Sequence, residues 1–298
     1  MHDTYLRTSQ STGEGHWKQR QDDRPLDTTD MCTSNSEAPQ DIRTPAQNEA
    51  TVRVSGDSER QAVLRDQSIK KRRKPQRSIF VSGVLAALDP AMKLLDIGCG
   101  TAHIIQELAA SKERSFFLGC DVSTAMIRIA KANAARFHNI RLVKGDGLNL
   151  PFPSDTFDIV VTRLAEYSPE EAYRVLRQGG WFFEYGLGPE ADREIRECFP
   201  RRIERRASSL LETRDWKQEV CEDIVKVGFV VSSVDDYWEA DYYESEEDLM
   251  DLIEMVPLVR QFDRRKDRAK IEELVETYGS AKGVPITWHY YVLRARKP

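Results

Sequence analysis

Three carboxylates and two glycines occupy positions in the sequence where they could together bind a nucleoside. Asp96 lies in an apolar run that leads into Gly98 and Gly100, Asp121 ends the next run 25 residues later, and Asp146 follows the third. Glycines permit positive φ and let a ligand lie against the backbone. A carboxylate at Asp96 suits a positively charged amine, one at Asp121 can accept both ribose hydroxyls, and one at Asp146 can accept from an adenine amino group. The pattern predicts a nucleoside ligand with an ammonium-bearing tail and no phosphate.

The spacing of the glycines separates this loop from the loops that bind dinucleotides. In a Gly-x-Gly-x-x-Gly pattern that begins at Gly98, the third glycine would fall at position 103, which is His103. That third glycine permits close packing of helix on strand beneath a pyrophosphate. The loop is therefore not predicted to bind NAD.

Apolar runs and helical patterns alternate on both sides of the loop. We expect a short helix from about residue 79 to 88, and then strands and helices in turn. The predicted strands are 93–97, 116–121, 140–143, 157–161 and 180–185, and the predicted helices between them are 102–112, 123–137 and 169–176. This alternation is typical of a parallel sheet with helices on both faces, whose right-handed crossovers bring the strand ends to one edge. The three carboxylates would meet at that edge.

The second half of the chain adds elements to this pattern. A helix at 214–227 and a strand at 229–237 are followed by two helical stripes, and the last predicted strand is 286–295. Ser245 precedes three acidic residues, which is typical of a helix N-terminus. The two helical stripes form an insert over about residues 244–280. Such an insert is either a lid or acceptor pocket or additional core.

Several of these segments, taken in order, resemble the successive motifs of one enzyme family. The motifs are Asp96-x-Gly98-x-Gly100-x-Ala102, Asp121, Gly145-Asp146-Gly147, Phe157-Asp158-Ile159-Val160 and Tyr173-Arg174-Val175-Leu176-Arg177-Gln178-Gly179-Gly180. They resemble class I S-adenosylmethionine-dependent methyltransferases, and among these the UbiE or type-11 group. The resemblance implies an α/β fold with a Rossmann-like, seven-stranded, mostly parallel sheet and helices on both faces. It also implies S-adenosyl-L-methionine as cofactor and methyl transfer by in-line displacement.

The resemblance gives a role to each residue of the predicted cofactor site. Asp96 would position the methionine amine, and Gly98 and Gly100 would let the cofactor lie on the loop. Asp121 would bind the ribose, and Asp146 would accept a hydrogen bond from adenine N6. The other cofactor-binding candidates are Ala102 in place of the third glycine of the ideal pattern, Val122 and Met126 against the adenine, Gly147 and Leu148 beside the ring, and Thr162 near the end of the fourth strand.

The segment after the fourth strand holds most of the catalytic candidates. The sulfonium is already a strong electrophile, so the main task is to hold a nucleophile in line with the methyl group. A base is needed only where the acceptor proton has a high pKa. We select Glu166 as the base, Tyr167 as an acceptor contact and His289 as a further catalytic candidate. Ordinary roles remain open, as a surface carboxylate for Glu166 and a core or edge residue for His289. Arg163 is expected either to bind an acidic acceptor or to pair with Glu184.

Charge is distributed in blocks, and these bear on the acceptor. Residues 235–254 contain ten acidic residues and no Lys or Arg, whereas 201–206 and 260–270 are basic. The acidic, aromatic block would repel a phosphate backbone but can hold a cationic or aromatic small molecule. The basic segments either contact RNA or balance the acids. We expect a small-molecule acceptor, with a ribosomal RNA base as the alternative. A non-catalytic, cofactor-binding regulatory module is an alternative of another class.

The first 75 residues differ in composition from the rest of the chain. They contain only eight Leu, Ile, Val or Phe, too few to bury a core. We predict a disordered polar arm over 1–75 that ends in a basic cluster, 70–77, and a methyltransferase domain over 76–298. Such a cluster is a solvated hinge, a nucleic-acid anchor or, in a eukaryotic source, a nuclear import signal.

Composition also excludes several classes of protein. No apolar run reaches the ~18–20 residues that cross a bilayer, and the N-terminus has no apolar core of a secretory signal. The five cysteines include no Cys-x-x-Cys pair, and the five histidines show no metal-ligand spacing. We expect a cytoplasmic protein with neither a metal nor a membrane partner, in which Cys99 and Cys120 are small core residues.

Overall fold

The strands form a single sheet that confirms the predicted fold class. The computed structural model describes residues 59–71, 79–203, 215–256 and 258–298, which lie in one compact unit of the chain. The strands are β1 (Lys93–Ile97), β2 (Phe116–Asp121), β3 (Ile140–Lys144), β4 (Phe157–Arg163), β5 (Leu176–Leu187), β6 (Val230–Tyr243) and β7 (Val284–Arg296). Their order is β3-β2-β1-β4-β5-β7-β6. All neighbours pair in parallel except β7, which runs antiparallel to both β5 and β6.

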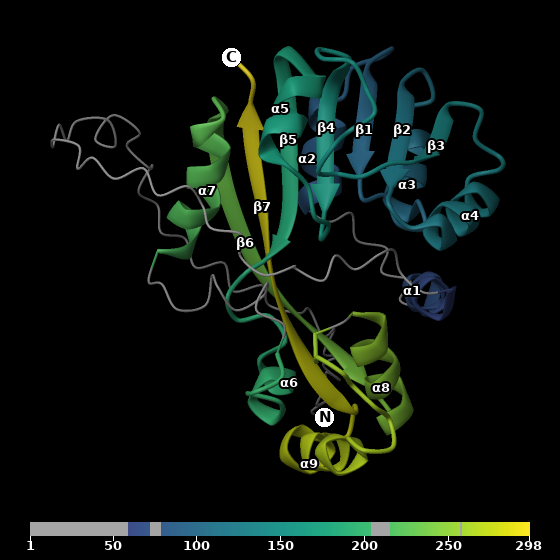
Figure 1. The fold of residues 1–298 in the computed structure, drawn as a ribbon, viewed down its shortest axis with the longest axis vertical. Helices are drawn as coiled ribbons and strands as arrows, with labels where there is room; N and C mark the ends of the chain where they lie inside the picture. Colours follow the sequence, from purple (N-terminus) through teal and green to yellow (C-terminus); the bar gives the residue numbers. More distant parts are fainter. Residues whose placement is uncertain (1–58, 72–78, 204–214, 257) are drawn as a thin grey trace, which may run out of the picture. The chain divides into compact units, whose positions relative to one another are not determined.

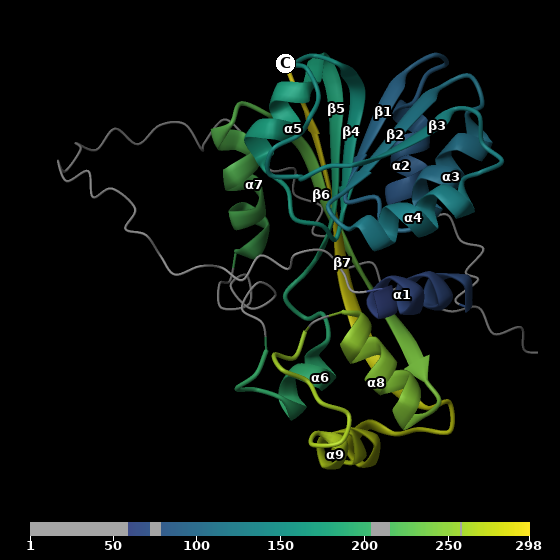
Figure 2. The same ribbon diagram turned by 45° about the vertical axis from the view of Figure 1, so that its right-hand side comes forward.

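Helices cover both faces of this sheet (Figures 1 and 2). One face packs on α2 (Ile79–Ala87), α3 (His103–Ser111) and α4 (Thr124–Asn133). The other packs on α5 (Pro169–Val175) and α7 (Trp216–Lys226). Strands β1 and β4 lie between these layers, and every residue of β4 except the last is buried. The buried centre fixes the carboxyl ends of β1, β2 and β4 relative to one another, as parallel sheets require.

Strands β6 and β7 continue beyond the end of β5 and carry a second core. They stay paired from Val230↔Arg296 to Tyr243↔Val284. Against this extension pack α6 (Arg193–Cys198), α8 (Glu246–Met255) and α9 (Arg268–Tyr278). Ser245 caps α8 as predicted, because its hydroxyl accepts from the Asp248 N–H at 3.1 Å. The insert therefore has its own hydrophobic interior.

The prediction of an unstructured arm as far as residue 75 is wrong for residues 59–71, which form helix α1 (Glu59–Lys71). Its buried Ala62 packs against Ala125 and Met126 of α4. On its other side, Arg65 donates to the carbonyl of Met255 in α8 at 3.1 Å. The rest of the predicted arm, and most of the basic cluster, lies outside the described residues.

Several predicted elements differ in length from those observed. Strand β6 extends to Tyr243, rather than to residue 237, because β7 pairs with it over that whole length. Helix α4 ends at Asn133, earlier than predicted, and α6 was not predicted at all. None of the described helices has the length and apolar character needed to cross a membrane.

Candidate functional site

The loop after β1 leaves open space on one side and is tightly packed on the other. Gly98 has φ +72°, and a Cβ built on it would lie 2.1 Å from the Cβ of Ala165. Gly100 has φ +53°, and a Cβ there would meet no atom within 4 Å. Both positions favour glycine because the left-handed region is costly for other residues. The segment after β4 thus closes over Gly98, while a ligand can approach the backbone at Gly100.

Asp121 and Asp146 are held by the backbone of the loops in which they act. The Gly100 N–H donates to Asp121 Oδ2 at 2.9 Å, and the Ser123 N–H donates to Oδ1 at 2.8 Å. The Leu148 N–H donates to Asp146 Oδ1 at 2.9 Å. Each carboxylate is therefore oriented by backbone donors. An ionised carboxylate has about four acceptor sites, so both can still accept from a ligand.

Asp96 is a buried carboxylate that makes no hydrogen bond to any described residue. It is 4% exposed, yet its oxygens are not fully sealed from solvent. Burial raises the pKa of Asp96 to about 7, with Arg163 opposing the shift and Asp121 adding to it. A carboxyl group in this setting is ionised most favourably when a cation binds beside it.

The residues expected beside the adenine surround the ends of β2 and β3. Val122 is 47% exposed, whereas Met126 is fully buried and packs against α1. Gly147 has no room for a side chain, because a Cβ would lie 2.5 Å from the Glu166 carbonyl oxygen. Its carbonyl accepts from the Ser168 N–H at 3.0 Å. The loop with Gly147 and Leu148 is thus packed directly against the segment after β4.

Two cofactor-binding candidates, Ala102 and Thr162, have buried side chains. Ala102 has φ 68° and is fully buried, so it occupies the left-handed position of the absent third glycine. Thr162 is 1% exposed, and its hydroxyl has no hydrogen-bond partner in the described chain. Because side chains alternate along β4, Thr162 faces the α5 and α7 side, away from its neighbour Arg163. The structure does not bring the Thr162 side chain together with Asp96.

Glu166 and Tyr167 have different environments although they are adjacent. Glu166 is exposed, and its backbone lies against Gly147. The Tyr167 hydroxyl donates to Glu184 Oε2 at 2.6 Å, and the Tyr291 hydroxyl donates to Glu184 Oε1 at 2.6 Å. Burial raises the pKa of Glu184, and the two tyrosine hydroxyls oppose the shift. The expectation that Arg163 pairs with Glu184 is wrong, since the two lie on opposite faces of the sheet. Glu184 and the two tyrosines form a buried cluster, and the sequence signal for it was an acidic residue within the apolar run of β5.

His289 lies in β7 with both ring nitrogens engaged. Its Nε2 is 3.1 Å from Asp236 Oδ2, and its Nδ1 accepts from the Glu190 N–H at 3.3 Å. Trp238 stacks on the ring at 4.2 Å, and the His289 side chain is 2% exposed. The ring therefore has neither a free nitrogen nor an open path to a substrate in the described part of the chain.

Cys99 and Cys120 are buried, as predicted. Burial raises the pKa of each thiol. A buried thiol with a raised pKa is a poor nucleophile. Among the described residues, no group of three or more His, Cys, Asp or Glu could hold a metal ion. Cys32 lies outside the described residues.

Comparisons with known proteins find methyltransferases that are similar to part of this chain. Residues 94–180 match the model of a methyltransferase domain. A demethylmenaquinone methyltransferase of Staphylococcus epidermidis is 37% identical over 98 residues, which are 30% of this chain and 40% of that protein. Residues 94–180 are therefore similar in sequence to the methyltransferase domains of known enzymes. The match to this methyltransferase family covers β1 to the first part of β5, where the predicted motifs lie.

A methyltransferase named YcgJ from Bacillus subtilis is similar to this chain both in sequence and in structure. It is 34% identical over 99 residues, which are 30% of this chain and 38% of that protein. The solved YcgJ structure has a TM-score of 0.52 at 21% identity and covers 74% of this chain and 99% of its own. The solved structure therefore shows a shared fold. This chain spans about two fifths of the length of these two curated relatives.

The residues at this edge of the sheet fit S-adenosylmethionine. The open side of Gly100 gives space against the backbone, and Asp96 is a buried acceptor without a hydrogen-bond partner in the described part of the chain. Asp121 and Asp146 lie at the ends of the next two strands, with backbone donors holding them in place. This set offers a carboxylate to an amine, to ribose hydroxyls and to an adenine amino group, in that order along the edge.

Proposed function

We propose that this protein transfers the methyl group of S-adenosylmethionine to a small-molecule acceptor. The observation that carries the proposal is the buried carboxylate of Asp96, which has no hydrogen-bond partner among the described residues and precedes the open loop at Gly100. A buried charge without a partner is costly, so it favours a site that is completed by a cationic ligand. The cofactor supplies an electrophilic methyl group on a positively charged sulfur.

The residues of the chain would act mainly by positioning. We assign the cofactor to Asp96, Gly98, Gly100, Asp121 and Asp146, with Val122, Met126, Gly147 and Leu148 around the adenine. The acceptor would lie against the segment after β4, which packs on both glycine loops. Holding the reacting groups in line can contribute several kcal/mol to the barrier reduction, on the order of half the total in favourable cases.

The candidate bases on this segment are not equivalent. Glu166 is exposed, and its backbone lies against the loop with Gly147, so it remains our candidate for accepting a proton. Tyr167 is tied to Glu184, which suits a role in fixing the segment rather than in proton transfer. The buried His289 is not assigned a catalytic role, because Asp236 and the Glu190 backbone engage both ring nitrogens.

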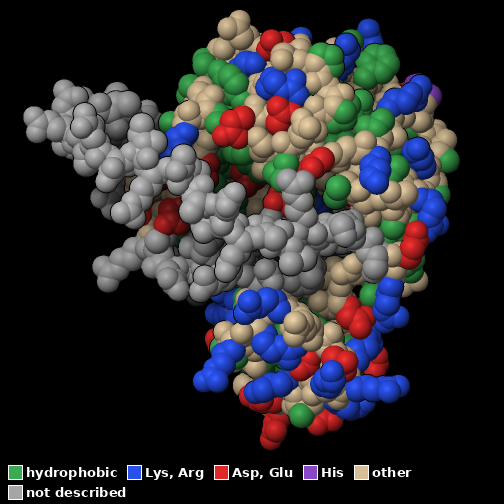
Figure 3. Space-filling model, in the orientation of Figure 1, with side chains coloured by type: hydrophobic (Ala, Val, Ile, Leu, Met, Phe, Trp, Pro, Cys, Tyr) green, Lys and Arg blue, Asp and Glu red, His purple; other side chains and the backbone are tan. Residues whose placement is uncertain are grey.

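Two observations favour a small acceptor over RNA. Several curated relatives are named demethylmenaquinone methyltransferases, and the substrate in that name is a small molecule. The basic side chains of the insert are largely engaged by acids: Arg202 with Asp267, Arg264 with Asp251 and Glu254, and Arg268 with Glu246. Figure 3 shows Lys and Arg interspersed with Asp and Glu over this region, rather than one continuous basic face.

The domain organisation we propose follows from the two cores. Residues 76–298 would form the catalytic domain, with the helices between β6 and β7 as an insert on the acceptor side. Helix α1 packs on both the cofactor half and the insert. We therefore include it in the folded enzyme.

The test is methyl transfer from labelled S-adenosylmethionine by the full chain. The acceptors are a panel of hydroquinones and phenols, total RNA and a protein extract, assayed in parallel. We expect label in the small-molecule panel and none with Gly98→Val, whose side chain would collide with Ala165. Label in RNA alone would overturn the acceptor class. Binding of S-adenosylhomocysteine without any transfer would favour the regulatory module.

A further inference from the structure

Arg163 carries a charge that the described part of the chain does not neutralise. It is the last residue of β4 and is partly buried. It makes no hydrogen bond or ion pair with another described residue, and its guanidinium lies over the ring of Tyr185, 5.5 Å from the centroid. A cation–π contact of this kind holds the side chain in place. Because Tyr185 contacts the flat face of the Arg163 guanidinium, the N–H groups at its edge can still donate to a ligand.

The position of Arg163 relative to Asp96 is fixed by the register of two parallel strands. Asp96 of β1 pairs with Val161 of β4. Arg163 follows Val161 by two residues, so its side chain leaves the sheet on the same face as that of Asp96. The two are diagonal neighbours at the carboxyl edge, and the positive charge of Arg163 favours the ionised form of Asp96.

We propose that Arg163 binds the carboxylate of the cofactor's methionine moiety while Asp96 binds its ammonium group. This assignment rests on the proposed function and deepens it. An α-amino acid carries both charges on one carbon. A ligand that brings its ammonium group to Asp96 therefore brings its carboxylate toward the neighbouring strand. Arginine suits that partner, since its planar donors match a carboxylate in a bidentate pair.

The assignment also accounts for the separation of the two side chains. A direct ion pair between Asp96 and Arg163 would consume both charges and close the space between them. With Arg163 held over Tyr185 and Asp96 held in β1, each side chain remains available to one charge of a zwitterion. Glu184, the other acid of this region, lies on the opposite face and is engaged by two tyrosines.

The experiment compares two ligands in titration calorimetry with the full chain. S-Adenosylhomocysteine has the carboxylate, and S-adenosyl-3-thiopropylamine lacks it but keeps the amine. We expect the wild type to bind S-adenosylhomocysteine about 10- to 100-fold more tightly, as for a hydrogen-bonded charged group. We expect Arg163→Ala to bind both ligands alike, with the affinity for the amine unchanged. Arg163→Lys should keep part of the preference.

The controls separate failure of this assignment from failure of the proposed function. Arg141→Ala removes an exposed arginine of β3 that bonds only to nearby carbonyls, and it should behave as wild type. If Arg163→Ala melts early, Arg163→Gln, which keeps most of the side-chain length, replaces it. If Arg163→Ala and Arg163→Gln still prefer S-adenosylhomocysteine to the amine, the role of Arg163 is overturned. It is also overturned if these variants bind S-adenosylhomocysteine with unchanged affinity and only their KM for the acceptor rises. No binding of either ligand by the wild type would overturn the proposed function as well.

Discussion

At the scale of single residues, the ionisation of Asp96 gives a pH-dependent cofactor affinity. Burial raises the pKa of Asp96 to about 7, and a ligand ammonium group requires the ionised form. The affinity for S-adenosylhomocysteine should therefore rise about eightfold between about pH 6 and about pH 7.5. Calorimetry at the two pH values measures this change. Asp96→Asn should bind more weakly and lose most of the pH dependence.

The raised pKa of Asp96 has the opposite effect on the stability of the ligand-free protein, which should fall as the pH rises. The folded-state pKa of Asp96 lies above its value of 3.8 in the unfolded chain. The folded state therefore holds the proton more tightly, and this contribution to stability is lost as the pH rises through about 7. Stability that falls while affinity rises would link both effects to one carboxyl group. An affinity that is flat over this range would contradict the assignment of Asp96.

Candidate site residues could be predicted from the sequence where their position depends only on the ends of parallel strands. Asp96, Asp121 and Asp146 could be found because parallel strands bring their carboxyl ends to one edge. The faces of Arg163, Glu184 and His289 could not be found, since they depend on register and on cross-strand partners. Glu184 was expected to meet Arg163, yet two tyrosine hydroxyls satisfy it on the other face.

At the scale of the elements, Gly147 joins the loop after β3 to the segment after β4. A Cβ at Gly147 would lie 2.5 Å from the Glu166 carbonyl oxygen and 3.0 Å from Ile97 Cγ2. We expect Gly147→Ala to destabilise the fold by about 1–3 kcal/mol and to weaken cofactor binding. Chemical denaturation and calorimetry measure the two effects.

Gly83 is the matched control for this substitution. It lies inside α2, and a Cβ there would meet its nearest atoms at 3.5 Å, an ordinary contact. Gly83→Ala should therefore stabilise the protein by about 0.5–1 kcal/mol through helix propensity. Equal destabilisation by both substitutions would show that the close approach at Gly147 is not the cause.

We expect the buried acid Asp66 to stabilise helix α1 more than the surface ion pairs of this helix do. Asp66 accepts from Lys70 at 2.6 Å and from Asn133 at 2.7 Å, and His103 lies 2.9 Å away. Asp66→Ala should cost about 1–3 kcal/mol, because the half-buried Asn133 and His103 side chains lose a hydrogen-bond partner. Glu59→Ala, which breaks an exposed pair with Arg128, should cost about 0–1 kcal/mol. Denaturant titration of both variants tests this difference, and a larger loss for Glu59→Ala would contradict it.

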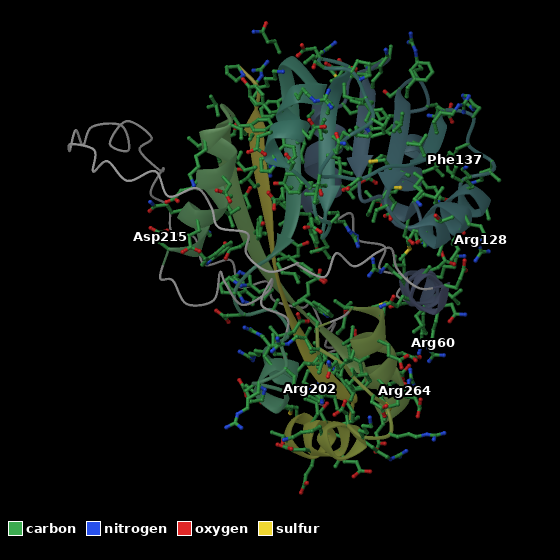
Figure 4. All side chains as sticks on the ribbon, in the orientation of Figure 1. Arg60, Arg128, Phe137, Arg202, Asp215 and Arg264 are labelled. Carbon is green, nitrogen blue, oxygen red and sulfur yellow. The ribbon has the colours of Figure 1, made fainter. Side chains whose placement is uncertain are left out.

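Helix α1 also shows what composition could not reveal. Residues 59–71 contain few apolar side chains, and only Ala62 and Asp66 are buried. The helix is stabilised by contacts with α4 and α8 that are distant in sequence, such as Arg60 with Glu254 at 3.0 Å. Figure 4 shows Arg60 between α1 and α8. Tertiary partners of this kind leave no local periodicity, whereas the strands of the sheet could be predicted because their burial is continuous.

At the scale of the whole molecule, charge pairing argues for weak binding to nucleic acid. The chain has a net charge of −5, and the arginines of the insert are engaged by acids. We expect little binding to generic RNA, and a shallow dependence of it on salt, because few phosphate contacts can form. Filter binding at about 50 and about 200 mM salt measures the slope. Tight binding with a steep salt slope would favour the RNA alternative.

The central claim is that the edge formed by β1, β2 and β3 binds S-adenosylmethionine. The most direct measurement is calorimetry of S-adenosylhomocysteine with the wild type and with Asp121→Ala, whose carboxylate is fixed by Gly100 and Ser123. Loss of hydrogen bonds from the ribose hydroxyls to a charged group should weaken binding about tenfold or more. The account predicts one binding site in the wild type and this loss in the variant. Equal affinities in the two proteins, or no binding by a folded wild type, would contradict it.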